Sequence, residues 1–252
     1  MDAMMSNGAI EHIGRQVLEP IGETLSFLPK SLQVTLSGWR RWLINGEESL
    51  TLTAEAIQEK VQSIPKDKLV EPEPYVAIPA IQQISYCQNS EDLRDLYANL
   101  LVASMNADTK WDVHPAFVDI IKQLTPDEAK YLKSLPDMII DIHPIIDVGV
   151  SLGDEARGTT PIISNFTNYN IDRLEHPEQI CSYIDNLVRL KLIEIPPERH
   201  IVDKSVYKAL EDDPLIQDPL RIEGGARIKY HYKHKYFRLT NLGVDFKKIV
   251  CH

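Results

Sequence analysis

Two short segments of the chain repeat the same spacing of an aspartate and a histidine before a proline. Asp112 pairs with His114 in the first segment, and Asp141 pairs with His143 in the second. Carboxylates and imidazoles bind divalent metal ions, so the two pairs together could form the site of a metal-dependent nuclease or hydrolase. The alternative is structural, because a histidine before a helix-starting proline commonly caps the helix and loop aspartates commonly form turns. We favour the structural interpretation.

A further pair, His231 and His234, lies in the segment HYKHK. Residues three apart on a strand lie on opposite faces, so these side chains are poorly placed to share a metal ion. The chain also lacks Gly-x-Ser-x-Gly, P-loop, His-Glu-x-x-His and dinucleotide-binding motifs. The motifs therefore assign no catalytic residue, no metal and no cofactor.

Positive charge is concentrated near the C-terminal end of an acidic chain. The formal net charge is −10, but residues 221–252 hold eight basic and two acidic residues, which leaves 19 basic and 35 acidic residues elsewhere. A basic segment on an acidic body can bind an anionic partner such as nucleic acid, or it can dock on the body itself. The candidate anion-binding residues are Arg189, Lys229, Lys233, Lys235 and Arg238.

The composition predicts a globular protein with a sizeable core, since 43% of the 252 residues are hydrophobic and 25% are charged. No apolar run approaches the roughly 20 residues that span a bilayer, and the N-terminal residues do not resemble a secretory signal. Cys87, Cys181 and Cys251 are far apart, which favours reduced thiols over disulfides or zinc. We therefore expect a cytoplasmic protein.

The N-terminal region, residues 1–64, has the apolar spacing of helices. Trp39 and Trp42 flank two arginines on one of them, a combination that can lie on a membrane surface. The alternative is a buried tryptophan stripe with arginine side chains reaching to solvent, and two basic residues are few for a membrane-binding face.

Residues 65–124 are predicted to form a proline-rich strap followed by a helical bundle. Four prolines within residues 65–79 predict an extended path. Helices are predicted after it, one of them capped by Ser90 and carrying Asn99 and Ser104 off its apolar stripe. These two polar side chains are expected to face solvent, although a hydrogen bond between helices would explain them equally well.

Residues 125–252 are predicted to form a winged-helix-like α+β domain with a basic C-terminal wing. A capping box at Thr125 starts its first helix, strands are expected within residues 138–171, and a helix is expected over 177–190. An acidic loop then precedes a hairpin or edge strand within residues 228–240 and a closing helix. The helix before the wing offers only Arg189 and Lys191 as cations, which are few for binding DNA phosphates. The fold class is thus mainly α with a small β component.

Several fragments in a fixed order carry a family resemblance: VEPEP followed by IPA, DLRDLYANLL, DVHPAFV, LTPDEA and the ending RLT-x-LG. Together they resemble the abortive-infection alpha (Abi-alpha) family of bacterial proteins. The resemblance implies a role in phage defence, in which an infected cell stops growing or dies before progeny are released. It supplies no catalytic residues, and the acidic insertion near Asp212 to Asp218 departs from the family pattern.

Three functions follow from these observations. The preferred one is a non-enzymatic defence protein that senses or binds a protein partner or a second copy of itself. The first alternative is a DNA-binding winged-helix regulator that uses the basic C-terminal region. The second is a metal-dependent nuclease or hydrolase that uses the two aspartate–histidine pairs.

Overall fold

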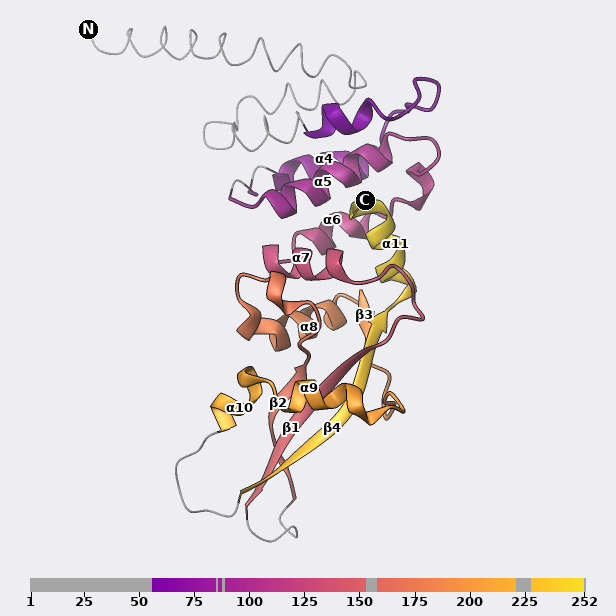
Figure 1. The fold of residues 1–252 in the computed structure, drawn as a ribbon. Helices are drawn as coiled ribbons and strands as arrows, with labels where there is room; N and C mark the ends of the chain where they lie inside the picture. The colour runs from indigo at the N-terminus through magenta and orange to yellow at the C-terminus, as the bar shows by residue number, and fades with distance from the viewer. Residues whose placement is uncertain (1–55, 85, 88, 153–157, 221–227, 252) are drawn as a thin grey trace, which may run out of the picture. The chain divides into compact units, whose positions relative to one another are not determined.

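The computed structural model describes residues 56–84, 86–87, 89–152, 158–220 and 228–251 of the chain (Figure 1). About half of these residues are helical, and they include one small four-stranded antiparallel sheet. The chain divides into two compact units, residues 1–123 with 249–252, and residues 124–248. The expected helices before residue 56, including the segment with Trp39 and Trp42, lie outside the described residues. No helix among the described residues is long and apolar enough to cross a membrane.

The first unit is built from helices. Residues 56–61 are helical, and α4 (Pro74–Ile84), α5 (Glu91–Ser104), the short 3-10 helix η2 (Lys110–Asp112) and α6 (Ala116–Ile121) follow. The predicted cap of α5 is confirmed, because the Ser90 hydroxyl accepts a hydrogen bond from the Leu93 backbone N–H. Apolar side chains of α4, α5 and α6 form the core of this unit: Val76, Ala80, Ile81, Ile84, Leu96, Tyr97, Leu100, Leu101, Phe117 and Ile121.

The prediction of an extended path through residue 79 was wrong for its second half. Residues 69–73 are non-helical and dock against the end of α5, where the Val70 N–H donates to the Met105 carbonyl at 2.8 Å. Pro74, however, begins α4, and Pro79 lies inside that helix. A proline fits the first position of a helix, where no N–H is needed. The second proline removes one hydrogen bond, which the burial of the apolar face of α4 outweighs.

The expectation that Asn99 and Ser104 face solvent was also wrong. Both side chains are buried, and the Ser104 hydroxyl donates back to the Leu101 carbonyl at 2.6 Å. The Asn99 amide donates to the carbonyl of Val250 at 2.8 Å. Val250 ends α11 (Asn241–Val250), so the alternative prediction of a hydrogen bond between helices is confirmed for Asn99.

The second unit opens with α7 (Pro126–Ser134), whose predicted capping box at Thr125 is confirmed. Glu128 of this box also accepts a hydrogen bond from Asn186 at 2.8 Å. The neighbouring Asp127 is buried and accepts the backbone N–H groups of Glu175 and His176 at 3.0 and 2.8 Å. The start of α7 therefore holds the segment that leads into the next helix.

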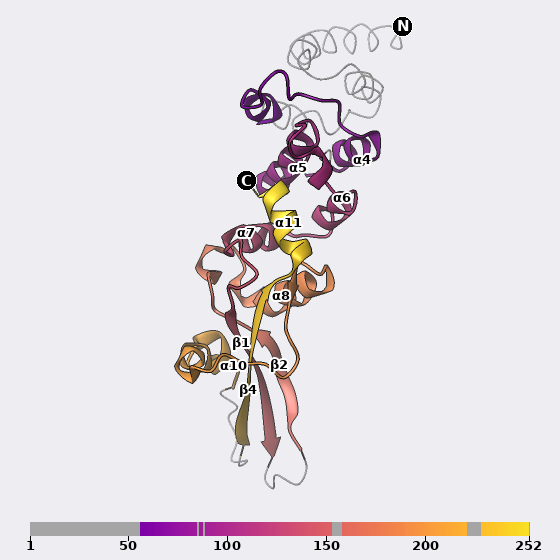
Figure 2. The same ribbon diagram turned by 90° about the vertical axis from the view of Figure 1, so that its right-hand side faces the viewer.

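Four strands form one antiparallel sheet in the order β2-β1-β4-β3 (Figures 1 and 2). They are β1 (His143–Leu152), β2 (Thr160–Phe166), β3 (Ile193–Glu194) and β4 (Ile228–Leu239). β1 and β4 pair along their whole common length, from His143 opposite Phe237 to Leu152 opposite Ile228. The described part of this unit also contains helix α8 (Ile180–Arg189), 3-10 helix η6 (Lys204–Tyr207), helices α9 (Lys208–Glu211) and α10 (Pro214–Leu220) and most of α11, with short 3-10 turns η4 (Ile171–Arg173) and η5 (Pro177–Gln179).

Three predictions for this unit need correction. β4 is one continuous strand that pairs with β1 and β3, so it is neither a hairpin nor an edge strand. The expected acidic loop is helical, since Pro214 begins α10. The first expected strand begins at His143 and not at Met138, because the segment before it forms a turn whose side chains are largely exposed.

Candidate functional site

Strand β4 carries most of the basic residues that the sequence singles out. Its side chains alternate between the two faces of the sheet, so Lys229, Lys233 and Lys235 share one face, whereas His234 and Arg238 belong to the other. The predicted separation of His231 and His234 is confirmed by their partners. His231 contacts the Ser151 hydroxyl on β1, whereas His234 contacts Glu211 on α9.

Lys235 is held by acceptors from the two neighbouring strands. Its ammonium donates to Asp147 Oδ1 at 2.5 Å and to Asn165 Oδ1 at 2.6 Å, and only 12% of its side chain is exposed. Asp147 also accepts the backbone N–H of Asn165 at 2.9 Å. Asn165 has a φ of 59°, in the left-handed region that asparagine tolerates better than most residues. Register shifts in the pairing of β1 with β2 between Ile146 and Gly149 allow this geometry.

Helix α8 continues the same cluster. The Asn165 amide donates to Asp185 Oδ1 of α8 at 2.6 Å. Cys181, one turn earlier on α8, has its pKa raised to about 11 by burial and by the nearby Asp185 and Asp147 carboxylates. Its thiol is therefore protonated at neutral pH and poorly suited to act as a nucleophile. The Asn165–Asp185 hydrogen bond therefore ties α8 to the cluster on the sheet.

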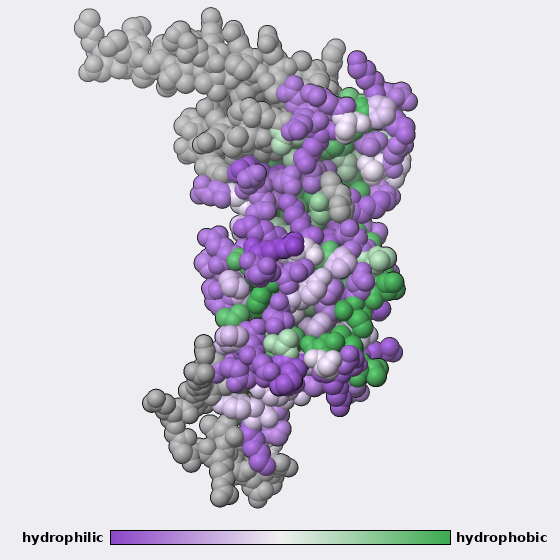
Figure 3. All heavy atoms as spheres, viewed as in Figure 1, coloured by the Kyte–Doolittle hydropathy of each residue, from purple (hydrophilic) through white to green (hydrophobic). Residues whose placement is uncertain are grey.

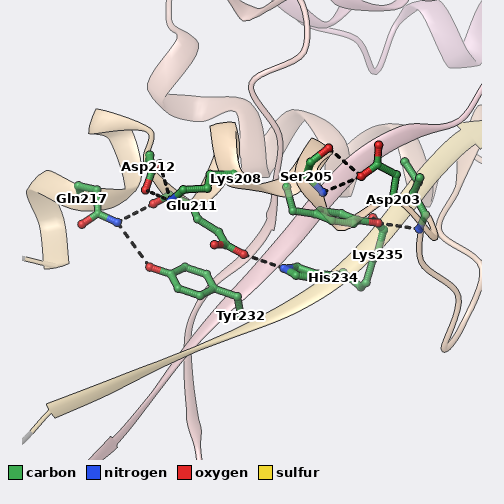
Figure 4. A network of polar contacts seen from close by, with 11 residues as sticks. Asp203, Ser205, Lys208, Glu211, Asp212, Gln217, Tyr232, His234 and Lys235 are labelled. Carbon is green, nitrogen blue, oxygen red and sulfur yellow. Dashed lines mark hydrogen bonds and ion pairs between the residues drawn. The ribbon is translucent and has the colours of Figure 1, made fainter.

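The opposite face of β4 is covered by η6, α9 and α10, and Figure 4 shows the polar contacts there. His234 Nε2 lies 2.7 Å from Glu211 Oε1, and its ring stacks on Tyr207 with a centroid distance of 4.1 Å. The Tyr207 hydroxyl donates to the Lys235 carbonyl and accepts the Ile201 N–H, both at 2.8 Å. Burial raises the pKa of Tyr207, so this phenol stays neutral and its hydrogen bonds stay in place.

The acidic segment is therefore docked on the basic strand. Besides Glu211, the helices contribute Gln217, which donates to the Glu211 carbonyl at 2.5 Å and to the Tyr232 hydroxyl at 3.4 Å. On the surface of α9, Lys208 pairs with Asp212 at 2.9 Å. The sequence suggested that the basic segment either binds an anionic partner or packs against the acidic remainder of the chain. These contacts are of the second kind.

The remaining anion-binding candidates are scattered. Lys229 and Lys233 are exposed toward the far end of β4. Arg189 ends α8, where its guanidinium donates to the Asn186 side chain at 2.6 and 3.0 Å. Arg238 pairs with Glu194 of β3 at 2.7 Å. The structure therefore groups the three lysines on one face of β4 and leaves the two arginines outside that group.

A pocket of about 360 Å³ lies where β4 ends and α11 begins. Residues from four segments line it, among them Ile139, Lys191, Glu194, Arg238, Leu239 and Leu242. Its wall is fixed by the Arg238–Glu194 ion pair and by the Thr240 hydroxyl, which donates to the Lys191 carbonyl at 2.5 Å. The lining is aliphatic at Ile139, Leu239 and Leu242 and charged at Lys191, Glu194 and Arg238.

An exposed aliphatic turn borders this pocket. The Asp141 N–H donates to the Met138 carbonyl at 3.2 Å, which places Ile139 and Ile140 at the centre of a four-residue turn. Ile139 lines the pocket, whereas Met138, Ile140 and Ile142 are 57%, 77% and 41% exposed. We call these three exposed residues the apolar ridge. Figure 3 shows apolar surface on the side of the second unit where the segment between α7 and β1 runs.

Both histidines among the four metal-ligand candidates have structural partners. His114 Nδ1 accepts the Ala116 N–H at 3.1 Å just before α6, although the N-cap residue of that helix is Pro115. His143 is buried, with its ring centroid 4.1 Å from Tyr169 and 5.1 Å from Phe237, and burial lowers its pKa. Asp112 is exposed, and Asp141 closes the turn described above. Within the described residues, no group of three or more histidine, cysteine or acidic side chains is arranged to hold a metal ion.

Sequence reasoning missed the residues that neutralise β4. Asp147 and Glu194, which pair with Lys235 and Arg238, and Glu211, which contacts His234, come from three different elements, and no local spacing connects them with these partners. One usable signal was Asp147 itself, because an aspartate within a β-branched strand implies a buried partner. The sequence did not reveal the apolar ridge, because its isoleucines have the pattern expected at the start of a buried strand.

One of the comparisons with known proteins gives a match, and it covers most of the chain. The sequence model of the family described as abortive infection alpha matches residues 45–250. No curated protein and no solved structure gives a significant match. The matched range covers most of the chain, including all the strands and the pocket described above. The chain therefore belongs to the abortive infection alpha family.

Proposed function

We propose that this protein is a non-enzymatic abortive-infection protein that acts in the cytoplasm by binding a protein partner through the apolar ridge and the adjoining pocket. One observation carries the proposal: Met138 and Ile140 expose large apolar side chains beside a pocket with a fixed wall. Contiguous exposed apolar surface next to a pocket is typical of interaction sites. Free cysteines at positions 87, 181 and 251 are compatible with a reducing compartment.

The neutralisation of β4 supports a protein partner over nucleic acid. Lys235 and Arg238 are engaged with Asp147 and Glu194, and a phosphate group would have to compete with these carboxylates. Affinity for DNA depends on the number of free cations that contact phosphates. Lys229 and Lys233 are exposed, and two lysines would offer few contacts to phosphate groups.

Expression of the chain in a phage-sensitive bacterium tests the defence role. We expect fewer plaques than with an empty vector, together with reduced survival of infected cells, because abortive infection sacrifices the host. Equal plaque numbers over a panel of phages would contradict the defence role. Plaque reduction with full survival of infected cells would contradict the abortive mode.

The DNA-binding winged-helix regulator stays as the second candidate, because Lys229, Lys233 and Lys235 share one face of the sheet. Electrophoretic mobility shifts over a salt series separate the two candidates. A DNA-binding protein shows affinity that falls steeply with salt concentration. We expect no shift at physiological salt, and a salt-dependent shift that Lys233→Glu removes would favour the regulator.

The metal-dependent nuclease or hydrolase has the weakest support, because His114 and His143 already have structural partners. Metal analysis of the purified protein and alanine replacement of Asp112, His114, Asp141 and His143 test it. We expect no bound metal in the wild type, and undiminished plaque reduction for Asp112→Ala and His114→Ala, which lie outside the proposed partner-binding surface. A stoichiometric metal that these replacements remove would overturn this view.

A further inference from the structure

The turn at Met138–Asp141 breaks a local rule of chain folding. Turn centres favour glycine, proline, asparagine, aspartate and serine, because these residues suit the backbone or bond to it. Here the two central residues are Ile139 and Ile140, and Ile140 is 77% exposed. An isoleucine at this position neither favours the turn nor fills the core. Departures from local preference without a structural gain are expected at functional surfaces.

A second departure lies on the rim of the same pocket. Helix α8 ends in a Schellman motif, in which the Leu192 N–H donates to the Leu187 carbonyl and the Lys191 N–H donates to the Val188 carbonyl, both at 3.0 Å. The residue after the helix is then left-handed, and Lys191 has a φ of 62°. Glycine is the usual residue there because a side chain strains this backbone. The chain instead places an exposed lysine beside the pocket.

These two departures complement each other. Ile140 offers an aliphatic side chain next to the carboxylate of Asp141. The pocket offers the aliphatic side chains of Ile139, Leu239 and Leu242 next to the ammonium of Lys191. Neither Asp141 nor Lys191 has a side-chain hydrogen bond or ion pair with another described residue. One chain therefore carries both halves of an apolar contact flanked by opposite charges.

We propose that the partner at this surface is a second copy of the chain. Ile140 of each copy enters the pocket of the other, and Asp141 of each copy pairs with Lys191 of the other. A two-fold axis makes both contacts at once, since a self-complementary patch is what a symmetric dimer requires. The inference rests on the proposed partner-binding function and specifies its partner.

Light scattering coupled to gel filtration gives the first test. The wild-type chain should elute with about twice its mass of 28.7 kDa at micromolar concentration, and Ile140→Asp should elute as a monomer. Lys191→Gly should also weaken the dimer, while its melting temperature as a monomer rises because glycine relieves the left-handed strain. This variant separates loss of association from loss of folding. A monomeric wild-type chain up to 100 μM, or dimers that both variants leave intact, would overturn the proposal.

A charge exchange between two variants gives the second test. Asp141→Lys alone places lysine against lysine in the dimer, and Lys191→Asp alone places aspartate against aspartate. Each variant should be at least tenfold weaker in self-association than the wild type. An equimolar mixture restores both opposite-charge contacts and should recover the dimer. Failure of the mixture to associate, with each variant folded and monomeric, would contradict the pairing of Asp141 with Lys191 across the interface.

The outcome also separates this inference from the proposed function. If the wild-type chain is monomeric but Ile140→Asp abolishes plaque reduction, the apolar ridge binds a different protein and the inference of self-association is wrong. If the chain dimerises through the ridge but gives no plaque reduction, the inference stands and the defence role fails.

Discussion

Lys235 on β4 and Asp147 on β1 form an ion pair of 2.5 Å in which the lysine side chain is 12% exposed and the aspartate side chain 24%. Asn165 of β2 accepts a further hydrogen bond from the same ammonium at 2.6 Å. A residue that sequence analysis assigns to anion binding thus joins three adjacent strands. Its charge is already compensated within the sheet.

Removing either partner of this pair should destabilise the second unit. Lys235→Ala leaves Asp147 without its cation, and we expect a loss of about 2 kcal/mol in the free energy of unfolding, reduced by partial solvent access. Urea unfolding of Lys235→Ala, Asp147→Ala and the double variant gives the coupling energy. The exposed pair Lys208 and Asp212 is the control and should show no measurable coupling. Equal behaviour of the two pairs would contradict the assigned role of Lys235.

Gly243 should tolerate no side chain. A Cβ atom at this position would lie 1.9 Å from the Leu192 carbonyl oxygen. This oxygen belongs to the backbone, so it cannot move aside as the end of a flexible side chain could. The Thr240 side chain accepts the Gly243 N–H at 2.9 Å, so the RLT-x-LG ending caps α11 and seats it against Leu192. We expect Gly243→Ala to cost about 3 kcal/mol, although alanine normally favours helices. A stabilised Gly243→Ala variant in thermal unfolding would show that α11 does not pack this closely.

Asn99 should be important for the stability of the first unit. Asn99→Ala leaves the buried Val250 carbonyl without its donor, at a cost of about 1–3 kcal/mol. Asn99→Asp should cost more, because it places a carboxylate oxygen against a carbonyl oxygen. Chemical unfolding measures both, with Gln123→Ala as a control at an exposed polar residue, whose amide donates to the Asp119 carbonyl. An Asn99→Asp variant as stable as the wild type would contradict the hydrogen bond.

Asp127 should give a pH-dependent contribution to stability. Burial raises the pKa of its carboxyl, but the N–H groups of Glu175 and His176 outweigh burial and lower the pKa below its ordinary value. A lowered pKa in the folded state means that the stabilisation is complete above the unfolded value of about 3.9 and is lost as the pH falls through the folded value. Asp127→Asn should therefore be less stable than the wild type at pH 7, and the difference should shrink below about pH 4. A difference that is constant from pH 7 to pH 3 would contradict this linkage.

Local signals predicted the helices well but not the partners of the basic strand. Ser90 and Thr125 are helix caps that depend on neighbouring residues alone, and both are confirmed. Pro74 and Pro79 led to the wrong prediction of an extended path. Burial of the apolar face stabilises α4 by more than the missing hydrogen bond at Pro79 destabilises it. Tertiary burial therefore outweighed a strong local preference.

The sequence predicted the positions of the strands, but it did not predict how they pair to form the sheet. The alternation in β4 was visible, yet its place between β1 and β3 depends on pairings between segments far apart in sequence. The ridge could not be separated from a strand, because exposure of Ile140 is decided by what the rest of the unit leaves uncovered. A site whose residues come together only in the tertiary structure is difficult to predict from a single sequence.

The central claim is that the protein acts through the apolar ridge and not through the basic strand. Plaque counts and infected-cell survival should be compared for cells that express the wild type, Ile140→Asp, and the double variant Lys229→Glu with Lys233→Glu at equal protein levels. We predict that Ile140→Asp loses protection and that the double variant retains it. Protection that survives Ile140→Asp but is lost in the double variant would contradict the account.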